Sequence, residues 1–220
     1  MMRKRTMWEA GGDEHPYVEI AGIKWATMNI GAESETDVGL YFQWGDTQGY
    51  TASQVGSGNY QKPFDSADYK FWNGTTPSSP FPTGFLKYNA IDNKTTLDLS
   101  DDAARLYWGE YWRMPTGAEF EALISATNAS ALYSGGNLVG IILTDKTDSS
   151  KELIFPVGGY AAGAVVGNTT QGFYHTSSLM GEHVSGCFIV YNDNGEAGAG
   201  TNGAPRVFGC NIRPVLDEPI

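Results

Sequence analysis

The histidines and cysteines are the residues of this chain best suited to metal binding or nucleophilic chemistry, and their spacing favours neither. They are His15, His175, His183, Cys187 and Cys210. No pair among them has the short spacing of a structural zinc site. His175 and His183 lie close to Glu182, which leaves a metal site as one alternative, but loop histidines at a binding surface or in solvent are the simpler interpretation. Two cysteines make no disulfide framework, although one bridge between them stays open.

Motifs for catalysis are also missing from the sequence. We find no Gly-x-Ser-x-Gly nucleophile elbow, no Gly-x-Gly-x-x-Gly fingerprint and no phosphate-binding loop ending in Gly-Lys. The segment GGYAAGAVVG (158–167) lacks both the motif spacing and a basic residue, so it predicts tight turns between strands. Asn192-Asp193-Asn194-Gly195 lacks the closing Glu of an EF-hand and predicts a hairpin turn. We therefore expect no catalytic residue, no metal and no cofactor.

The charge balance restricts the partners. Fourteen Lys and Arg against 25 Asp and Glu give a formal charge of −11 and a pI of about 4.6. This charge repels phosphate backbones and anionic lipids, so we expect no nucleic-acid binding. The basic start MMRKR is not followed by an apolar stretch, and no apolar run is long enough to cross a bilayer. We expect no signal peptide and no membrane insertion.

Few elements can position a site in such a chain, and most of them are short. Twenty-eight glycines predict many turns. Residues 17–31 alternate in the manner of two half-buried strands around Ala21-Gly22. From about 39 to 90 the pattern dissolves into Gly, Ser, Pro and Asn mixed with aromatic residues. A long loop so rich in aromatics is expected to be packed.

Two helices are predicted in the middle of the chain, with strands after them. Ser100 caps the first, Asp101 and Asp102 occupy its first turn, and Gly109 ends it. Thr116 and Glu119 form a capping box for a second helix of about ten residues. The runs 137–144 and 151–157 predict strands joined by a polar turn, and 187–192 and 206–215 predict a second strand pair. This order indicates an α+β domain.

The domain organisation follows from the same patterns. We interpret residues 1–16 as a polar lead-in and 17–220 as a single domain. The aromatic-rich stretch at about 45–95 would have no core of its own, which favours an insertion within that domain.

Six segments carry a family resemblance. They are GIKWATMNIGA (22–32), GLYFQWGDT (39–47), DDAARLYWGEYWRMPTGAEFEALI (101–124), LIFPVGGYAAG (153–163), GFYHTSS (172–178) and FGCNIRPV (208–215). In this order they resemble the Fibrobacter succinogenes major paralogous domain family. That resemblance implies a C-type lectin-like fold, with two helices, short twisted antiparallel sheets and long irregular loops. It also implies kinship with the formylglycine-generating enzyme and with variable proteins of diversity-generating retroelements.

The resemblance implies binding through the C-terminal part of the chain. In retroelement-diversified proteins of this fold, a rigid frame displays a changing C-terminal surface. The expected ligand-binding residues are Tyr174, His175, Leu179, Met180, Glu182, His183, Thr201, Asn202, Arg206 and Phe208. An ordinary lectin-like loop region of fixed sequence is the equal alternative, and Arg213 before Pro214 is expected to be structural.

The function expected from these observations is non-catalytic binding. The partner would be a protein or glycan receptor on a cell surface, bound by a phage or prophage protein that acts in the virion or outside the cell, with an oligomer allowed. One rival is a fixed surface adhesin that stacks sugars on Trp44 or Trp72. The other is an oxidase like the formylglycine-generating group, but Cys187 and Cys210 are 23 residues apart and match no such copper site.

Overall fold

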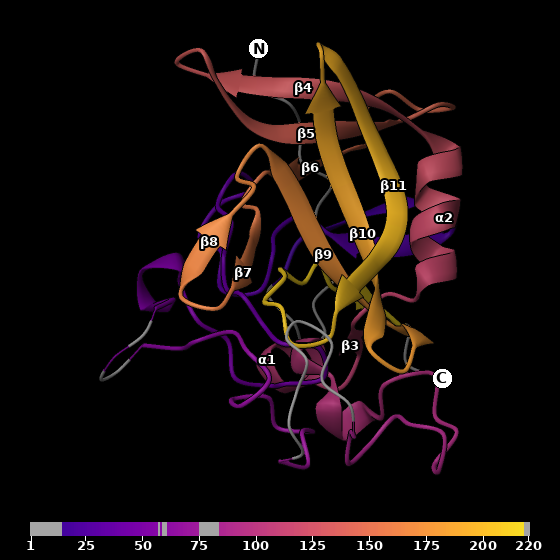
Figure 1. Ribbon diagram of the computed structural model, residues 1–220. Coiled ribbons are helices and arrows are strands. Elements are labelled where there is room, and N and C mark those ends of the chain that lie inside the picture. Colours follow the sequence, from indigo (N-terminus) through magenta and orange to yellow (C-terminus); the bar gives the residue numbers. More distant parts are fainter. Residues whose placement is uncertain (1–14, 57, 59–60, 75–83, 218–220) are drawn as a thin grey trace.

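The computed structural model describes residues 15–56, 58, 61–74 and 84–217, which form antiparallel sheets and two α-helices (Figure 1). The predicted α+β class is therefore confirmed. Of the predicted lead-in, residues 1–14 lie outside the described residues. No helix in the described ranges combines the length and the apolar character needed to span a bilayer.

A four-stranded sheet joins segments from distant parts of the chain. Its order is β1 (Tyr17–Ile20), β2 (Ile23–Ala26), β12 (Val215–Leu216) and β3 (Trp112–Arg113). The predicted strand pair at the start is confirmed, with Ala21 and Gly22 turning at positive φ. On β12, Val215 pairs with both Trp25 and Arg113, so this strand holds the other three together.

The two helices lie close to their predicted positions, and one cap differs. Helix α1 spans Ala103–Trp108 and ends at Gly109, but its N-cap is Asp102, whose carboxylate accepts from the backbone N–H groups of Ala104 and Arg105. The predicted Ser100 cap is wrong because a 3-10 turn, η2 (Leu99–Asp101), precedes the helix.

The second helix confirms its prediction. Helix α2 spans Gly117–Ala126, and Thr116 and Glu119 form its capping box. Arg113 also donates two hydrogen bonds to the Glu119 carboxylate, at 2.6 and 2.8 Å. The entry to α2 is thus fixed by both its cap and an ion pair.

Two three-stranded sheets and a hairpin complete the fold. One sheet has the order β4 (Thr127–Ser134), β5 (Asn137–Asp145) and β6 (Glu152–Pro156), and the hairpin pairs β7 (Tyr160–Ala162) with β8 (Val165–Gly167). The C-terminal sheet has the order β11 (Glu196–Pro205), β10 (Val184–Asp193) and β9 (Gln171–Gly181). The strands predicted at 137–144 and 151–157 are confirmed, and so is the hairpin turn at Asn194-Gly195.

The predicted pairing of 187–192 with 206–215 is wrong. Strand β10 already has β9 on one side and β11 on the other, so no edge remains for residues 206–215. Gly209, Cys210 and Asn211 instead make single bridges, to Ala161, Phe42 and Tyr174, and Val215 belongs to β12. Residues 197–205, for which we predicted no strand, form most of β11, and residues 179–181 end β9.

The aromatic-rich stretch is packed, as predicted. Another short 3-10 turn, η1 (Ala52–Gln54), interrupts it. In its described part, Phe42, Trp44, Tyr69, Phe71 and Tyr88 are buried in one cluster with Trp108 and Trp112. This cluster lies under the end of the C-terminal sheet where β9 meets β10, and so supports the region in which binding residues were expected.

Candidate binding surfaces

The C-terminal sheet has an inner face that belongs to the core. Tyr174, Phe188 and Val190 are buried there with Phe120 and Phe155. The Phe188 ring stacks on Phe120 of α2, with 4.2 Å between ring centroids. The hydroxyl of Tyr174 donates to the Pro156 carbonyl at 2.7 Å. These positions have no freedom to contact a ligand.

The opposite face of the same sheet is half-exposed and apolar. We call it the outer face and define it by Phe173, Ile189 and Tyr191 of the sheet together with Tyr160 of β7 and Phe208 of the segment after β11, which pack beside them. Ile189 lies opposite Phe173 in the register of β10 and β9. Tyr160 of β7 packs edge-on against Phe173 and stacks on Phe208, with centroids 5.2 Å apart and planes 3° from parallel. Half-buried aromatic side chains offer apolar area to a binding partner. Because their rings are already held by packing, they lose little conformational freedom when the partner covers them.

The outer face ends where other segments cover the sheet. His175 and Cys187 face each other across β9 and β10, and the alternation of the strands assigns them to the outer side. Both are nevertheless buried, because the backbone around Phe42 and Phe208 lies over them. The exposed part of the face therefore runs from Phe173 and Ile189 toward Tyr191.

Three residues expected to bind a ligand are buried, so their assignment to an exposed face is wrong. They are Tyr174, His175 and Arg206. Tyr174 belongs to the inner face. The His175 ring donates through Nε2 toward the carbonyls of Phe42 and Phe208, at 3.0 and 3.2 Å. Burial lowers the pKa of His175 to about 4, so the ring is neutral at pH 7.

Arg206 is a buried cation held by carbonyls. Its guanidinium donates to the carbonyl oxygens of Lys87, Tyr88 and Glu182, each at 3.0 Å, and to the Tyr69 hydroxyl at 3.2 Å. It also lies 4.0 Å from the centroid of the Phe85 ring. Every bond joins Arg206 to another segment, so its role is to hold segments together rather than to contact a ligand.

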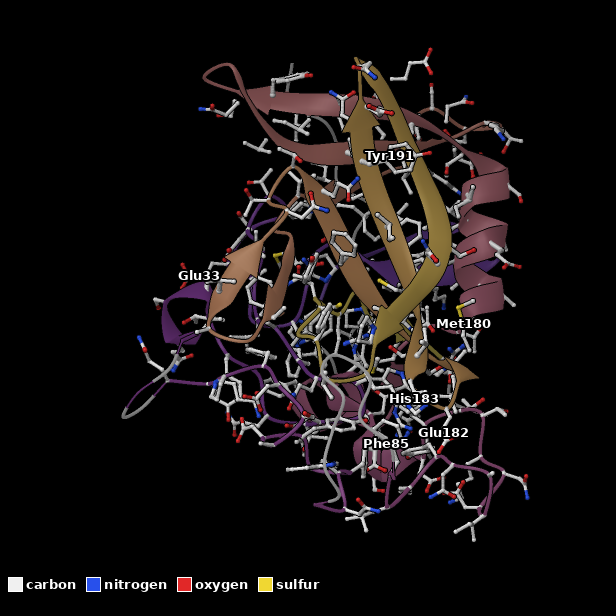
Figure 2. All side chains as sticks on the ribbon, viewed as in Figure 1. Glu33, Phe85, Met180, Glu182, His183 and Tyr191 are labelled. Atoms are coloured by element: carbon white, nitrogen blue, oxygen red, sulfur yellow. The ribbon has the colours of Figure 1, made fainter. Side chains whose placement is uncertain are left out.

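Three other expected residues line a common cavity, which we call the tip pocket. Leu179, Met180 and Glu182 form one wall of a cavity of about 300 Å³ between the end of the β9–β10 hairpin and the loop at 88–95. Figure 2 shows Met180, Glu182 and His183 near one end of the sheet and Tyr191 toward the other. His183 is half-buried beside Phe85, 5.7 Å between ring centroids.

The remaining expected residues are scattered. Phe208 belongs to the outer face. Asn202 is exposed opposite Cys187, on the outer side of β11. Thr201 is exposed on the inner side, 3.5 Å from the Glu121 carboxylate of α2. The ten residues therefore do not form a single face.

The two cysteines considered for redox chemistry lie in the interior, and so does the proposed sugar platform Trp44. Cys187 and Cys210 are free thiols, buried together with Ala204. Burial raises the pKa of the Cys210 thiol. Within the described ranges, no three His, Cys, Asp or Glu side chains are grouped to hold a metal ion. Trp44, a proposed sugar platform, is buried, and its indole N–H donates to the Thr176 carbonyl at 2.8 Å.

The sequence interpretation missed Phe173, Ile189 and Tyr191. A signal for Ile189 and Tyr191 was present, because Cys187-Phe188-Ile189-Val190-Tyr191 is an unbroken run of apolar side chains. In a strand, such a run gives both faces of the sheet large apolar residues. Such a strand puts Phe188 and Val190 on one face and Ile189 and Tyr191 on the other.

Comparisons of the chain with protein-family models, with curated proteins and with solved structures find no match.

Proposed function

We propose that this protein is a non-catalytic ligand- or receptor-binding protein with a C-type lectin-like fold, and that its outer face contacts the partner. The observation that carries the proposal is the difference in burial between the two faces of β9 and β10. Tyr174, Phe188 and Val190 are buried, whereas their neighbours Phe173, Ile189 and Tyr191 are half-exposed. Large apolar side chains kept at a surface are typical of binding hot spots.

The family motifs support the fold part of this proposal through the roles of their residues. Arg213 of the motif FGCNIRPV is buried and donates to the Asn29 side chain and to the carbonyls of Ala26, Thr27 and Ile154, at 2.7 to 3.1 Å. The motif WRMPT contributes β3 and the cap of α2. Arg213 and the capped start of α2 therefore stabilise the fold, whereas Phe208 of the first motif lies at the outer face.

We propose further that the outer face is diversified by a retroelement and that the protein is encoded by a phage or prophage. A changing surface must tolerate substitution without loss of the core. The outer positions approach this condition: their side chains point away from the packing of Phe120, Phe155 and Phe188, and Phe173 and Ile189 pack against the smaller buried cluster of Cys187, Ala204 and Cys210. The partner would be a protein or glycan receptor on a cell surface, reached from a virion or from outside the cell.

Deep sequencing of the 3′ end of the gene, together with its genomic flank, tests this proposal. Diversification predicts adenine-directed substitutions at the codons for Phe173, Ile189, Tyr191 and Asn202, beside a template repeat and a reverse transcriptase. The codons for Phe188, Val190 and Arg213 should stay constant. Equal variation on both faces, or an invariant 3′ end, would overturn diversification.

A fixed carbohydrate-binding adhesin is the second candidate. The stacked pair of Tyr160 and Phe208 favours it, since parallel half-exposed rings resemble a platform for a sugar face. A glycan array probed with the wild type, Tyr160→Ala and Trp72→Ala tests this candidate. Loss of a glycan signal in Tyr160→Ala alone supports sugar binding at the outer face. Loss in Trp72→Ala alone moves the site to the aromatic-rich stretch, and no signal in the wild type eliminates the candidate.

A further inference from the structure

The tip pocket lies at the other end of the C-terminal sheet from Tyr191 and is a second place where a ligand can enter. Its lining comes from two segments, the loop that holds Tyr88, Lys94 and Thr95 and the β9–β10 hairpin that holds Leu179, Met180 and Glu182. A cavity of about 300 Å³ accommodates a side chain or a small molecule.

The two walls of the tip pocket are fixed to each other. One nitrogen of Arg206, Nη1, donates both to the Tyr88 carbonyl on the loop and to the Glu182 carbonyl on the hairpin. The backbone N–H of Leu179 donates to the Thr95 carbonyl at 2.8 Å. Because these bonds cross between the walls, the cavity exists before a ligand arrives and binding requires little ordering.

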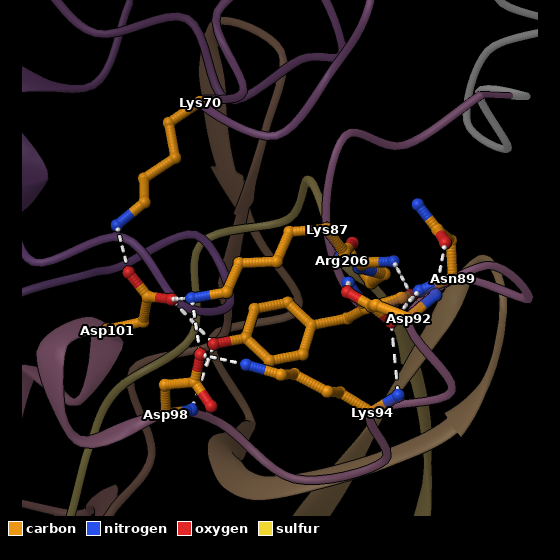
Figure 3. A network of polar contacts seen from close by, with 9 residues as sticks. Lys70, Lys87, Asn89, Asp92, Lys94, Asp98, Asp101 and Arg206 are labelled. Atoms are coloured by element: carbon orange, nitrogen blue, oxygen red, sulfur yellow. Dashed lines mark hydrogen bonds and ion pairs between the residues drawn. The ribbon is translucent and has the colours of Figure 1, made fainter.

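The positive charges beside the tip pocket already have partners. Lys94 pairs with Asp98 at 2.6 Å, and Lys87 pairs with Asp98 and Asp101 at 2.7 and 2.5 Å (Figure 3). The Asp92 carboxylate accepts from the backbone N–H groups of Tyr88, Asn89 and Lys94. The charged groups of the loop wall are therefore used to hold the loop.

Glu182 is different from these neighbours. Its backbone carbonyl is bound by Arg206, but its exposed carboxylate has no hydrogen bond or ion pair with any residue that the structure describes. Met180, which lines the same cavity, leaves 63% of its surface exposed. An unpaired carboxylate and an exposed thioether in one cavity lining match an ammonium group on an aliphatic stem, which supplies a charge for one and apolar contact for the other.

We infer that the tip pocket binds an alkylammonium group, as presented by a lysine side chain on a partner or by a free alkylamine. The net charge of −11 favours the approach of such a ligand. The tip pocket does not include the outer face, so binding at the tip pocket is independent of the proposed function.

Nuclear magnetic resonance of the protein labelled with ¹³C at its methionine methyl groups tests the inference. The probes are N-acetyl-lysine methylamide, n-pentylamine and, as the uncharged control, N-acetyl-norleucine methylamide. We expect a saturable shift of the Met180 methyl signal, assigned with Met180→Leu, from at least one amine and none from the norleucine compound. A shift with the lysine compound alone assigns a peptide ligand, and one with pentylamine alone assigns a free amine.

Two charge-matched variants complete the test. Glu182→Gln should weaken binding by about twofold to fivefold, because an ion pair made by an exposed carboxylate contributes a factor of that size. Glu33→Gln removes the same charge at an exposed position far from the pocket (Figure 2) and should leave binding unchanged. Absence of a Met180 shift with both amines, or equal weakening by the two variants, would overturn the inference.

Discussion

The inner and outer faces of the C-terminal sheet use the same strands for opposite purposes. Phe188 and Ile189 are adjacent in β10, yet the first is fully buried against α2 and the second is half-exposed beside Phe173. The difference follows from strand geometry, since successive side chains point to opposite sides. One strand can therefore contribute side chains to the core on one face and to a partly exposed surface on the other.

The outer side of the sheet is not exposed along its whole length. At His175 and Cys187 the outer side is covered by the segments around Phe42 and Phe208, so strand parity alone does not decide exposure. A binding surface is defined jointly by the sheet and by what the rest of the chain leaves uncovered.

The largest effect on stability is expected when one residue on each face is replaced by alanine and the two variants are compared. Phe188→Ala should lower the free energy of unfolding by about 3–5 kcal/mol, because it opens a cavity between α2 and the sheet. Ile189→Ala should cost about 1 kcal/mol, since a half-exposed side chain loses less burial. Urea denaturation of both variants measures the two values. Similar losses would show that the faces are equally part of the core.

His175, on the covered part of the outer side, should make the protein sensitive to acid. Its pKa is about 4 in the fold, against an ordinary value of 6.5, so the unfolded chain binds the proton more readily. The contribution of neutral His175 to the free energy of unfolding is fully present above pH 6.5. It falls by up to about 3 kcal/mol as the pH drops toward 4.

The matched variant is His175→Gln, whose side-chain amide offers a donor close to the position of Nε2. Denaturation at pH 7 and pH 4.5 should give a smaller difference for this variant than for the wild type. An unchanged difference would assign the acid sensitivity to other groups.

The cover of the inner face depends on α2, and its cap is expected to contribute a moderate amount. Thr116→Ala removes the acceptor for the Glu119 backbone N–H and should cost about 1 kcal/mol. Thr116→Ser keeps the hydroxyl and should restore most of the loss. Thermal unfolding distinguishes the two, and an equal loss in both variants would argue against the cap.

The smallest effect concerns two glycines on the outer side of β11. A Cβ at Gly198 would lie 2.6 Å from the Tyr191 ring, whereas a Cβ at Gly200 would have no heavy atom within 4 Å. Gly200→Ala should stabilise the protein by about 0.5 kcal/mol through the unfolded chain. Gly198→Ala should lose that gain and displace the Tyr191 ring, which its proton chemical shifts report. An unmoved ring would mean that Tyr191 does not lie across the strand.

Local signals predicted the parts of the fold that local chemistry determines. The capping box at Thr116 and Glu119 and the turn at Asn194-Gly195 each satisfy backbone groups within a few residues, so the sequence alone was enough. Strand β11 was missed because Ala and Gly have no strand preference of their own, and its pairing with β10 imposes the extended form.

Long-range contacts explain the errors in the site. Arg206 looked like a surface residue because nothing nearby in sequence satisfies it, and its acceptors at Lys87 and Tyr88 lie more than 100 residues away. Tyr174 and His175 were misplaced for the same reason. Met180 and Glu182 were placed correctly at the surface, because their exposure depends on a hairpin end and not on distant packing.

The central position of β12 has a consequence for how the chain is made. Residues 215–216 leave the ribosome after the whole of the C-terminal sheet, and β2 and β3 are not bridged until they do. Any frameshift or stop codon between 172 and 210 removes both β12 and Arg213. Nascent chains with a damaged reading frame would then lack the strand that joins β2 to β3 and would go to proteolysis, so that only chains translated to residue 216 complete the fold.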